Sequence, residues 1–354
     1  MNNTFIKKVI SILTAAVMLV ALLPTCMTAS AQIIRSGTCG ENLTWELDDN
    51  YVLTISGTGD MTDYQNIVYV NCPWGSYPKQ VIINSGVTSI GNYAFYPCDK
   101  LTSVTLPDTL KRIGDYALAY CSMESVAIPD GVTRIGDGAF YFCQGLTELT
   151  IPDSVTYIGK TAFGQCANIR SITLPKHITE LSDYVLSDCR GLKTITIPDS
   201  VISIGKCAFF QCSFTEVTIP EGVTTIKDEA FRHCLSLKKV TIPESVTNFG
   251  EKVFQYYNSD GTYHTIEGLT LYVFPGSAAH RYAIANKIKY ELLRFRGDAD
   301  GDEKVTVADA LVSLRAAVGL TALDDASLAA ADIDGDGIIT VSDALRILRI
   351  AAKL

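Results

Sequence analysis

The residues best placed to do chemistry are aspartates near the C-terminus, in two copies of the pattern D-x-D-G-D that begin at Asp298 and Asp332. Carboxylates at loop positions 1, 3, 5 and 12, with a backbone carbonyl at position 7, form an oxygen cage that suits Ca²⁺. Acids this close repel one another, so a solvated acidic turn does not explain why the spacing is repeated. The predicted ligands of two Ca²⁺ ions are Asp298, Asp300, Asp302, Lys304, Thr306 and Asp309 in the first loop, and Asp332, Asp334, Asp336, Ile338, Thr340 and Asp343 in the second.

The two loops differ at position six, where a left-handed turn favours Gly. The second loop has Gly337 at this position, whereas the first has Glu303. A residue other than Gly in the left-handed conformation costs about 1 kcal/mol. We therefore expect the first loop to bind its ion more weakly and to fill second in a titration.

An amphipathic helix is expected after each loop, from Val307 and from Val341. The carboxylates of Asp309 and Asp343 suit the positive N-terminal end of a helix dipole. No helix is evident before either loop, so each unit is predicted to be half of an EF-hand. The two helices share the pattern V-x-D-A-L-x-x-L-R, and the module can therefore present two related faces.

Two such loop–helix units resemble a type I dockerin over residues 295–354. The resemblance implies a small all-α calcium-binding module that binds a cohesin module of a scaffoldin, and so places the protein in a cellulosome. The candidate cohesin contacts are Val307, Ala308, Leu311, Leu314 and Arg315 in the first helix, and Val341, Ser342, Leu345, Leu348 and Arg349 in the second. For the two arginines, solvated basic residues near the helix ends are an equal alternative.

A short motif recurs at nearly constant spacing along the middle of the chain, first as SIGNYAF around Ile90 and last as NFGEKVF around Phe249. Between its copies lies a second element, L-x-x-V-x-L-P, whose apolar alternation predicts a strand that Pro ends. A single such turn cannot bury its own apolar side. The turns are therefore expected to stack into a solenoid with a continuous core.

This pattern resembles the BspA-like leucine-rich repeats over residues 80–294, with an end cap expected to be a strand followed by one helix. Residues 32–79 resemble the segment that precedes these repeats, and they are expected to form an N-terminal β cap with a hairpin that turns at Asp48-Asp49-Asn50. The predicted fold is an α/β repeat solenoid with short parallel strands, followed by the small helical module.

Seven of the 11 cysteines recur once per turn. A set of disulfides would not place an odd number of cysteines at one repeat position, and the spacing of zinc sites is missing. We interpret them as a buried stack of thiols, which act as small apolar fillers with a weak donor. Cys39 and Cys72 lie outside this register, and whether they pair across the N-terminal cap is left open. The seven are Cys98, Cys121, Cys143, Cys166, Cys189, Cys212 and Cys234.

Two groups of aromatic residues are candidate contact surfaces of the solenoid. The first lies at equivalent positions of the first turns. Its rings are expected either to stack on sugars or protein, or simply to pack between turns. It comprises Tyr96, Tyr120, Tyr141 and Phe142. The second lies in an insertion before the end cap, and insertions in solenoids project as loops that often carry contacts. Its candidate ligand-binding residues are Tyr256, Tyr257, Tyr263 and His264, with an ordinary cap loop as the alternative.

The N-terminus has the parts of a secretory signal peptide in residues 1–31. A short basic start at Lys7 and Lys8 precedes an apolar run and an Ala29-Ser30-Ala31 exit. A lipoprotein processed at Cys26 is disfavoured, because the residues before it fit such processing poorly. We therefore expect a secreted, extracellular protein at a cell-surface cellulosome, without membrane insertion after signal cleavage.

Charge and residue constellations exclude several functions. The net charge of −9 argues against a nucleic-acid partner, which normally meets a basic face. The four histidines lie at scattered repeat phases without a neighbouring nucleophile. The acids on successive strands, such as Glu148 and Glu216, alternate with Arg170 and Lys193 and predict a mixed-charge face rather than a pair of catalytic carboxylates.

The sequence therefore predicts a non-catalytic protein. Its C-terminal module is expected to bind a scaffoldin cohesin in a calcium-dependent way, while the leucine-rich repeats bind an unknown protein or polysaccharide. The alternatives are a surface adhesin to plant cell wall or host, and a polysaccharide hydrolase with an unrecognised site.

Overall fold

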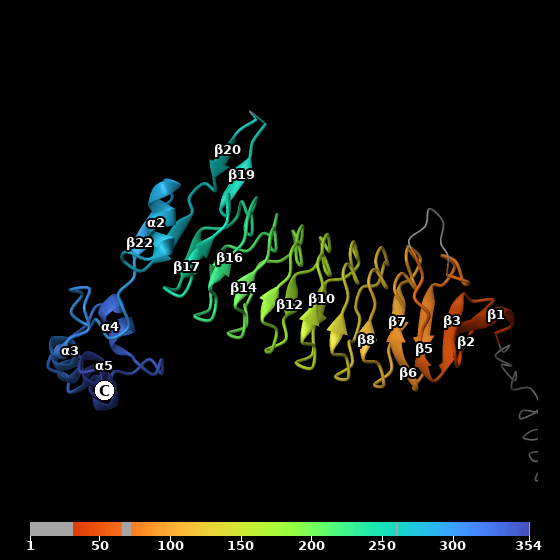
Figure 1. Cartoon of the computed structure of the whole chain (residues 1–354), viewed down its shortest axis with the longest axis horizontal. Coiled ribbons are helices and arrows are strands. Elements are labelled where there is room, and N and C mark those ends of the chain that lie inside the picture. The colour runs from red at the N-terminus through yellow and green to blue at the C-terminus, as the bar shows by residue number, and fades with distance from the viewer. Residues whose placement is uncertain (1–30, 66–71, 260, 354) are drawn as a thin grey trace, which may run out of the picture.

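The computed structural model describes residues 31–65, 72–259 and 261–353 (Figure 1). The predicted signal peptide, residues 1–31, lies outside the described residues except for Ala31. The described chain forms a row of stacked turns that is followed by a small helical module (Figure 1). The predicted fold, a repeat solenoid with short parallel strands and a helical C-terminal module, is confirmed.

An antiparallel sheet covers the first turn of the solenoid, and it consists of β1 (Ile33–Gly40), β2 (Leu43–Asp48) and β3 (Val52–Gly57). The hairpin between β2 and β3 turns where the sequence predicts. The Asp48 carboxylate fixes this turn, because it accepts hydrogen bonds from the amides of Asn50 and Val52 at 2.9 and 2.8 Å. β3 then pairs in parallel with the first repeat strand, so the cap continues into the sheet of the repeats.

Each full turn of the solenoid passes through two short strand positions, and neighbouring turns pair in parallel. One position, which the L-x-x-V-x-L-P element and its variants occupy in the middle turns, gives β5 (Gln80–Ile83), β7 (Ser103–Thr105), β10 (Glu148–Thr150), β12 (Ser171–Thr173), β15 (Glu216–Thr218), β17 (Lys239–Ile242) and β21 (Thr270–Val273). The other position gives β4 (Gly59–Asp60), β6 (Val87–Ile90), β8 (Arg112–Ile113), β9 (Arg134–Ile135), β11 (Tyr157–Ile158), β13 (Glu180–Leu181), β14 (Ser203–Ile204), β16 (Thr225–Ile226) and β18 (Asn248–Phe249). Up to β18, the described turns contain strands and turns but no helix.

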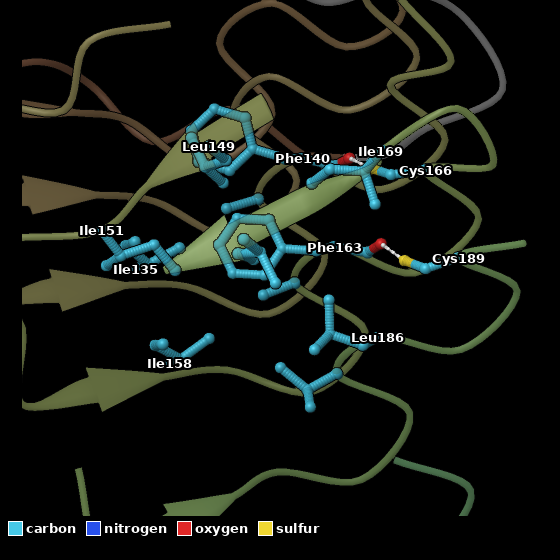
Figure 2. Packing of buried hydrophobic residues seen from close by; sticks show 14 of the residues in the cluster. Ile135, Phe140, Leu149, Ile151, Ile158, Phe163, Cys166, Ile169, Leu186 and Cys189 are labelled. Atoms are coloured by element: carbon cyan, nitrogen blue, oxygen red, sulfur yellow. Dashed lines mark hydrogen bonds between the residues drawn. The ribbon is translucent and has the colours of Figure 1, made fainter. Parts of the chain in front are cut away.

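A phenylalanine in most turns forms the centre of the core. Phe140 and Phe163 stack with their ring centroids 5.6 Å apart and their planes 15° from parallel (Figure 2). The same arrangement joins Phe209, Phe231 and Phe254 at 5.2 and 5.3 Å. All five side chains are fully buried. Because each ring packs on a ring of the next turn, the stability of one turn depends on its neighbours.

The cysteines of the repeat register form a buried column beside these rings, as predicted. The thiols also donate to backbone carbonyls of the preceding turn, a role that the spacing did not reveal. The Sγ atom of Cys166 lies 3.2 Å from the carbonyl oxygen of Phe140, and Figure 2 shows the same contact one turn later. Cys39 and Cys72 are buried free thiols, so the structure does not contain the disulfide that the sequence left open.

We expect the register cysteines to resist alkylation in the native protein at neutral pH. Burial raises the pKa of Cys143 and Cys234 to about 12, so the reactive thiolate is scarce. Mass spectrometry after iodoacetamide treatment should find these thiols unmodified before, and modified after, denaturation in guanidinium. Fast labelling of any register cysteine in the folded protein would contradict the buried column.

The end cap differs from the predicted strand and single helix. The insertion before it forms a hairpin of β19 (Gln255–Tyr257) and β20 (Tyr263–Thr265) rather than a loop. After β21 come α2 (Ala278–Ala285) and a further strand, β22 (Lys289–Leu292), which pairs in parallel with β21. All four residues of β22 are exposed, so this strand adds no buried apolar face to the core.

The helical module contains α3 (Val307–Ala317), α4 (Asp325–Ala331) and α5 (Val341–Ala351). The prediction that no helix enters the second loop was wrong, because α4 ends immediately before Asp332. Asp324 caps α4 by accepting a hydrogen bond from the amide of Ser327 at 2.7 Å. The helix has only seven residues, too few to show a periodic apolar pattern.

Candidate metal centre and docking groove

The first acidic loop is folded around the carboxylate of Asp298. This side chain is almost fully buried and accepts hydrogen bonds from the amides of Gly301, Asp302 and Glu303 at 2.7, 3.1 and 3.0 Å. In the second loop Asp332 accepts from the three equivalent amides at 2.7, 3.2 and 2.8 Å. The repeated sequence pattern therefore produces the same local fold twice.

Both loops are left-handed at position six, as the sequence predicts. The angle φ is 66° at Glu303 and 81° at Gly337. The first loop thus places a glutamate in a backbone conformation that Gly adopts without steric cost. This is the main backbone difference that we expect to separate the two loops in affinity.

Three carboxylates converge in each loop, with ligand oxygens that all lie within 4.8 Å of one another. Burial and the nearby charges of Asp309, Asp302 and Asp298 raise the pKa of Asp300, as expected where like charges crowd together. An oxygen donor set of this density fits a hard divalent cation such as Ca²⁺. The two converging groups are Asp298, Asp300 and Asp302, and Asp332, Asp334 and Asp343; the predicted ligands Asp309 and Asp336 lie outside them.

Asp309 and Asp343 tie each loop to the helix that follows it. Both are fully buried. In the second loop, one Asp343 oxygen accepts from the amide and hydroxyl of Thr340 at 2.9 and 2.7 Å, and the other accepts from the amide of Ile333 at 3.0 Å. Burial opposes ionisation of Asp343, but these donors outweigh it and lower the pKa of the carboxyl group. Asp309 forms the corresponding capping box with Thr306.

An apolar groove of about 270 Å³ lies between α3 and α5. The two helices contribute equivalent residues, at the i, i+3, i+4 and i+7 positions of one helical face. Several of these side chains are strongly exposed: Val307 by 64%, Leu311 by 55%, Val341 by 57% and Leu345 by 49%. The groove is lined by Val307, Ala310, Leu311, Leu314, Val341, Ala344, Leu345 and Leu348.

Comparison with protein families identifies the two parts of the chain. The family model of the BspA type leucine-rich repeat region matches in six copies over residues 70–193 and 179–288, which is more than half of the chain. The chain belongs to the BspA-type leucine-rich repeat family. The family model of the type I dockerin domain matches residues 296–350. This BspA-type protein therefore carries a type I dockerin after its repeats.

Solved structures similar to this BspA-type protein include several bacterial leucine-rich repeat proteins. One from Eubacterium ventriosum is 28% identical, with 67% of this chain and 72% of that chain covered and a TM-score of 0.44. One from Bacteroides ovatus is 18% identical, with 72% and 99% covered and a TM-score of 0.42. A leucine-rich cell surface protein from Faecalibacterium prausnitzii is 20% identical, with 75% and 97% covered and a TM-score of 0.41. A search of curated proteins found no match.

Both matched families are interaction modules rather than enzymes, and type I dockerins generally bind calcium. Such modules are typical of extracellular or cell-surface proteins. Over the residues that the structure describes, no helix is long and apolar enough to cross a bilayer.

All ten residues of the dockerin that the sequence nominated for cohesin binding are exposed, and six of them line the groove. Two groove residues were missed, Ala310 and Ala344, although the i, i+3 spacing from Val307 and Val341 would have indicated them. Also missed was Arg346, whose guanidinium lies 3.0 Å from the Asp334 carboxylate. The first half of the dockerin has Val312 at the equivalent position, so only the second loop has this ion pair.

We expect Glu303→Gly to tighten calcium binding by the first loop about fivefold relative to Glu303→Gln. Both variants remove the glutamate charge, but only Gly removes the left-handed backbone cost of about 1 kcal/mol. The comparison requires calorimetric titration in a background in which Asp332→Ala disables the second loop. Equal affinities of the two variants would show that backbone strain does not weaken the first loop.

The hairpin residues nominated as ligand contacts lie close together. Tyr256 is opposite His264 in the hairpin, and Tyr257 is opposite Tyr263. The ring of Tyr263 already packs against cations, since the Nζ atom of Lys252 lies 4.2 Å from its centroid. Tyr257 is 47% exposed and has the most accessible ring of the hairpin, so it is the best placed of the four to contact a ligand.

The aromatic residues of the first turns pack between turns, which is one of the two roles that the sequence allowed. They form a continuous aromatic column of Tyr93, Tyr96, Tyr116, Tyr120, Tyr141 and Phe142. Tyr93 and Tyr116 stack at 5.2 Å, and Tyr120 and Phe142 at 4.8 Å. The stack of Tyr93 and Tyr116 within this column ends against Gly138, where a Cβ atom would approach the Tyr116 ring to 2.5 Å. All six side chains are only partly buried, so packing does not use their whole surface.

Proposed function

We propose that this protein is a secreted, non-catalytic component of a cellulosome. Its dockerin binds a scaffoldin cohesin in a calcium-dependent way, and its leucine-rich repeats bind a protein or polysaccharide target. The observation that carries the proposal is the exposed apolar groove between α3 and α5. Contiguous apolar surface of this kind on an exposed helix pair marks a site of protein association.

Two Ca²⁺ ions, one in each loop, would hold the helices that line this groove. The converging carboxylates supply hard oxygen donors, and the backbone carbonyls of Lys304 and Ile338 complete the predicted sets. Asp309 and Asp343 connect the loops to the first turns of α3 and α5. Ion binding is thereby coupled to the positions of the groove residues.

The two halves of the groove are nearly alike, since Leu311 and Leu345 occupy equivalent positions of the two helices. A partner that contacts mainly one helix therefore has two related ways to bind. The rim adds Arg315 and Arg349, which suit an acidic or polar edge of the partner. The proposed contacts are those predicted from the sequence.

The experiment that tests this function measures binding of the full chain to a panel of recombinant cohesins by calorimetry. We expect at least one cohesin to bind, and Leu311→Glu with Leu345→Glu to weaken that binding by about a hundredfold or more, because each is a hot-spot loss of roughly 2 kcal/mol. Either substitution alone should cost less, since the other half remains intact.

A matched control is Ile202→Glu, which changes an exposed residue of the solenoid by the same substitution. It should leave cohesin binding unchanged. If no cohesin binds the wild-type protein, or if the double variant binds as tightly as the wild type, the proposed docking function is wrong.

For the solenoid, the hairpin of β19 and β20 is a proposed contact region, with Tyr256, Tyr257, Tyr263 and His264 as candidates. It extends from the stacked turns next to the end cap (Figure 1). A pull-down by the full chain against insoluble polysaccharide and against secreted proteins distinguishes the two kinds of target. Turnover of a polysaccharide in the same assay would instead indicate an enzyme.

A further inference from the structure

A groove of about 410 Å³ runs along the aromatic column in the first turns of the solenoid. Two rings of the column, Tyr120 and Phe142, line it together with Pro97. Polar side chains complete the lining, and the principal ones are Asp99, Ser122 and Gln144. The volume lies in the range of about 300–1,000 Å³ that is usual for small-ligand sites.

The fold does not require rings at these positions. The backbone is left-handed at Tyr120 and Phe142, with φ of 59° at both, and it has nearly the same φ at the equivalent residues of later turns, Gln165, Asp188 and Gln211. Left-handed backbone disfavours bulky side chains, so the rings are the less favourable choice. In the later turns polar groups fill this register, and the guanidinium of Arg190 lies 2.9 Å from Asp188 and 2.6 Å from Gln211.

The polar lining of the groove keeps hydrogen-bonding capacity. Neither the Asp99 carboxylate nor the Gln144 side-chain amide has a hydrogen-bond partner among the described residues, and both residues are exposed. The Ser122 hydroxyl donates to the Asp99 carbonyl oxygen at 2.7 Å, which leaves its own oxygen able to accept. No basic side chain lines the groove. The lining therefore suits a neutral ligand rich in hydroxyl groups better than an anion.

We propose that this groove binds a neutral oligosaccharide segment, with a sugar ring against Tyr120 and Phe142 and its hydroxyls bonded to Asp99, Ser122 and Gln144. A sugar ring has an apolar C–H face that packs on an aromatic ring, and hydroxyls at its rim that need donors and acceptors. The groove offers both kinds of surface within one turn of each other. A protein partner would need a larger apolar anchor than these two rings provide.

This inference deepens the proposed function, because it names the target class of the repeats and places it on a surface remote in sequence from the hairpin. The test is a calorimetric titration of the full chain with three neutral oligosaccharides, cellohexaose, xylohexaose and mannohexaose, and with one acidic one, an oligogalacturonide. We expect at least one neutral oligosaccharide to bind and the acidic one to bind more weakly. Phe142→Gln, which installs the residue of the next turn at this register, and Asp99→Asn should each weaken binding about tenfold.

The matched control is Tyr184→Thr, which replaces a left-handed, partly exposed tyrosine outside the groove by the residue type found one turn earlier, at Thr161. It should bind as the wild type does. Absence of binding to every neutral oligosaccharide overturns the inference, and so does unchanged binding by both groove variants. Cohesin binding measured on the same preparations tests the docking function separately, because none of these substitutions lies in the dockerin.

Discussion

Replacing Asp309 and Asp343 together by alanine is expected to abolish calcium binding and to unfold the helices of the dockerin. Each carboxylate is fully buried and completes the capping box of its helix by accepting a hydrogen bond from the amide of the N-cap residue, Thr306 or Thr340. Loss of a helix cap costs about 0.5–2 kcal/mol. The variant also loses one predicted ligand from each loop, and loss even of an outer partner of a metal ligand typically weakens binding about 10–100-fold.

In far-ultraviolet circular dichroism of the full chain the signal of the solenoid would dominate that of the dockerin, so calcium calorimetry on the full chain is the primary measurement. We expect no measurable heat of calcium binding from the double variant. Asp325→Ala is the control, because this aspartate is exposed and lies outside both loops. Wild-type calcium affinity in the double variant would refute the ligand assignment.

Phe163→Ala is expected to lower the free energy of unfolding of the solenoid by about 3–5 kcal/mol. The ring is fully buried and stacks on Phe140, and its backbone carbonyl accepts the thiol of Cys189 at 3.3 Å. Truncation leaves a cavity between two turns, and a stack of turns transmits that loss to its neighbours. The effect should appear as a lower midpoint in urea denaturation followed by tyrosine fluorescence.

Ile202→Ala provides the comparison for this prediction, because Ile202 is half exposed and its truncation should change stability by less than about 0.5 kcal/mol. A loss below roughly 1 kcal/mol for Phe163→Ala would show that neighbouring turns collapse into the cavity. In that case the phenylalanine stack does not determine the stability of the solenoid.

The parts of the fold that follow from local repetition could be predicted from the sequence. The repeated D-x-D-G-D pattern predicted two similar loops, and the left-handed backbone at Glu303 and Gly337 agrees with that expectation. The recurrence of one cysteine per turn predicted the column of buried cysteines. In each case a residue contacts or resembles its equivalent in the next copy, so the repeat spacing alone was enough to predict the arrangement.

Elements without a repeat were harder to predict. Strand β22 has no buried residue, and it lies at the end of the sheet through its parallel pairing with β21, a contact between distant residues that its own four residues do not reveal. The short helix α4 is fixed by the Asp324 cap and by packing against α5. The groove beside Tyr120 and Phe142 combines residues of several turns with Pro97, and no single sequence motif contains it.

Calorimetric titration of a cohesin into the full-length protein, in calcium and again in excess chelator, tests the central claim most directly. The account predicts tight binding in calcium that is lost in chelator and restored when calcium is added back. Binding that stays equally tight without calcium would contradict a docking groove held in place by two calcium loops.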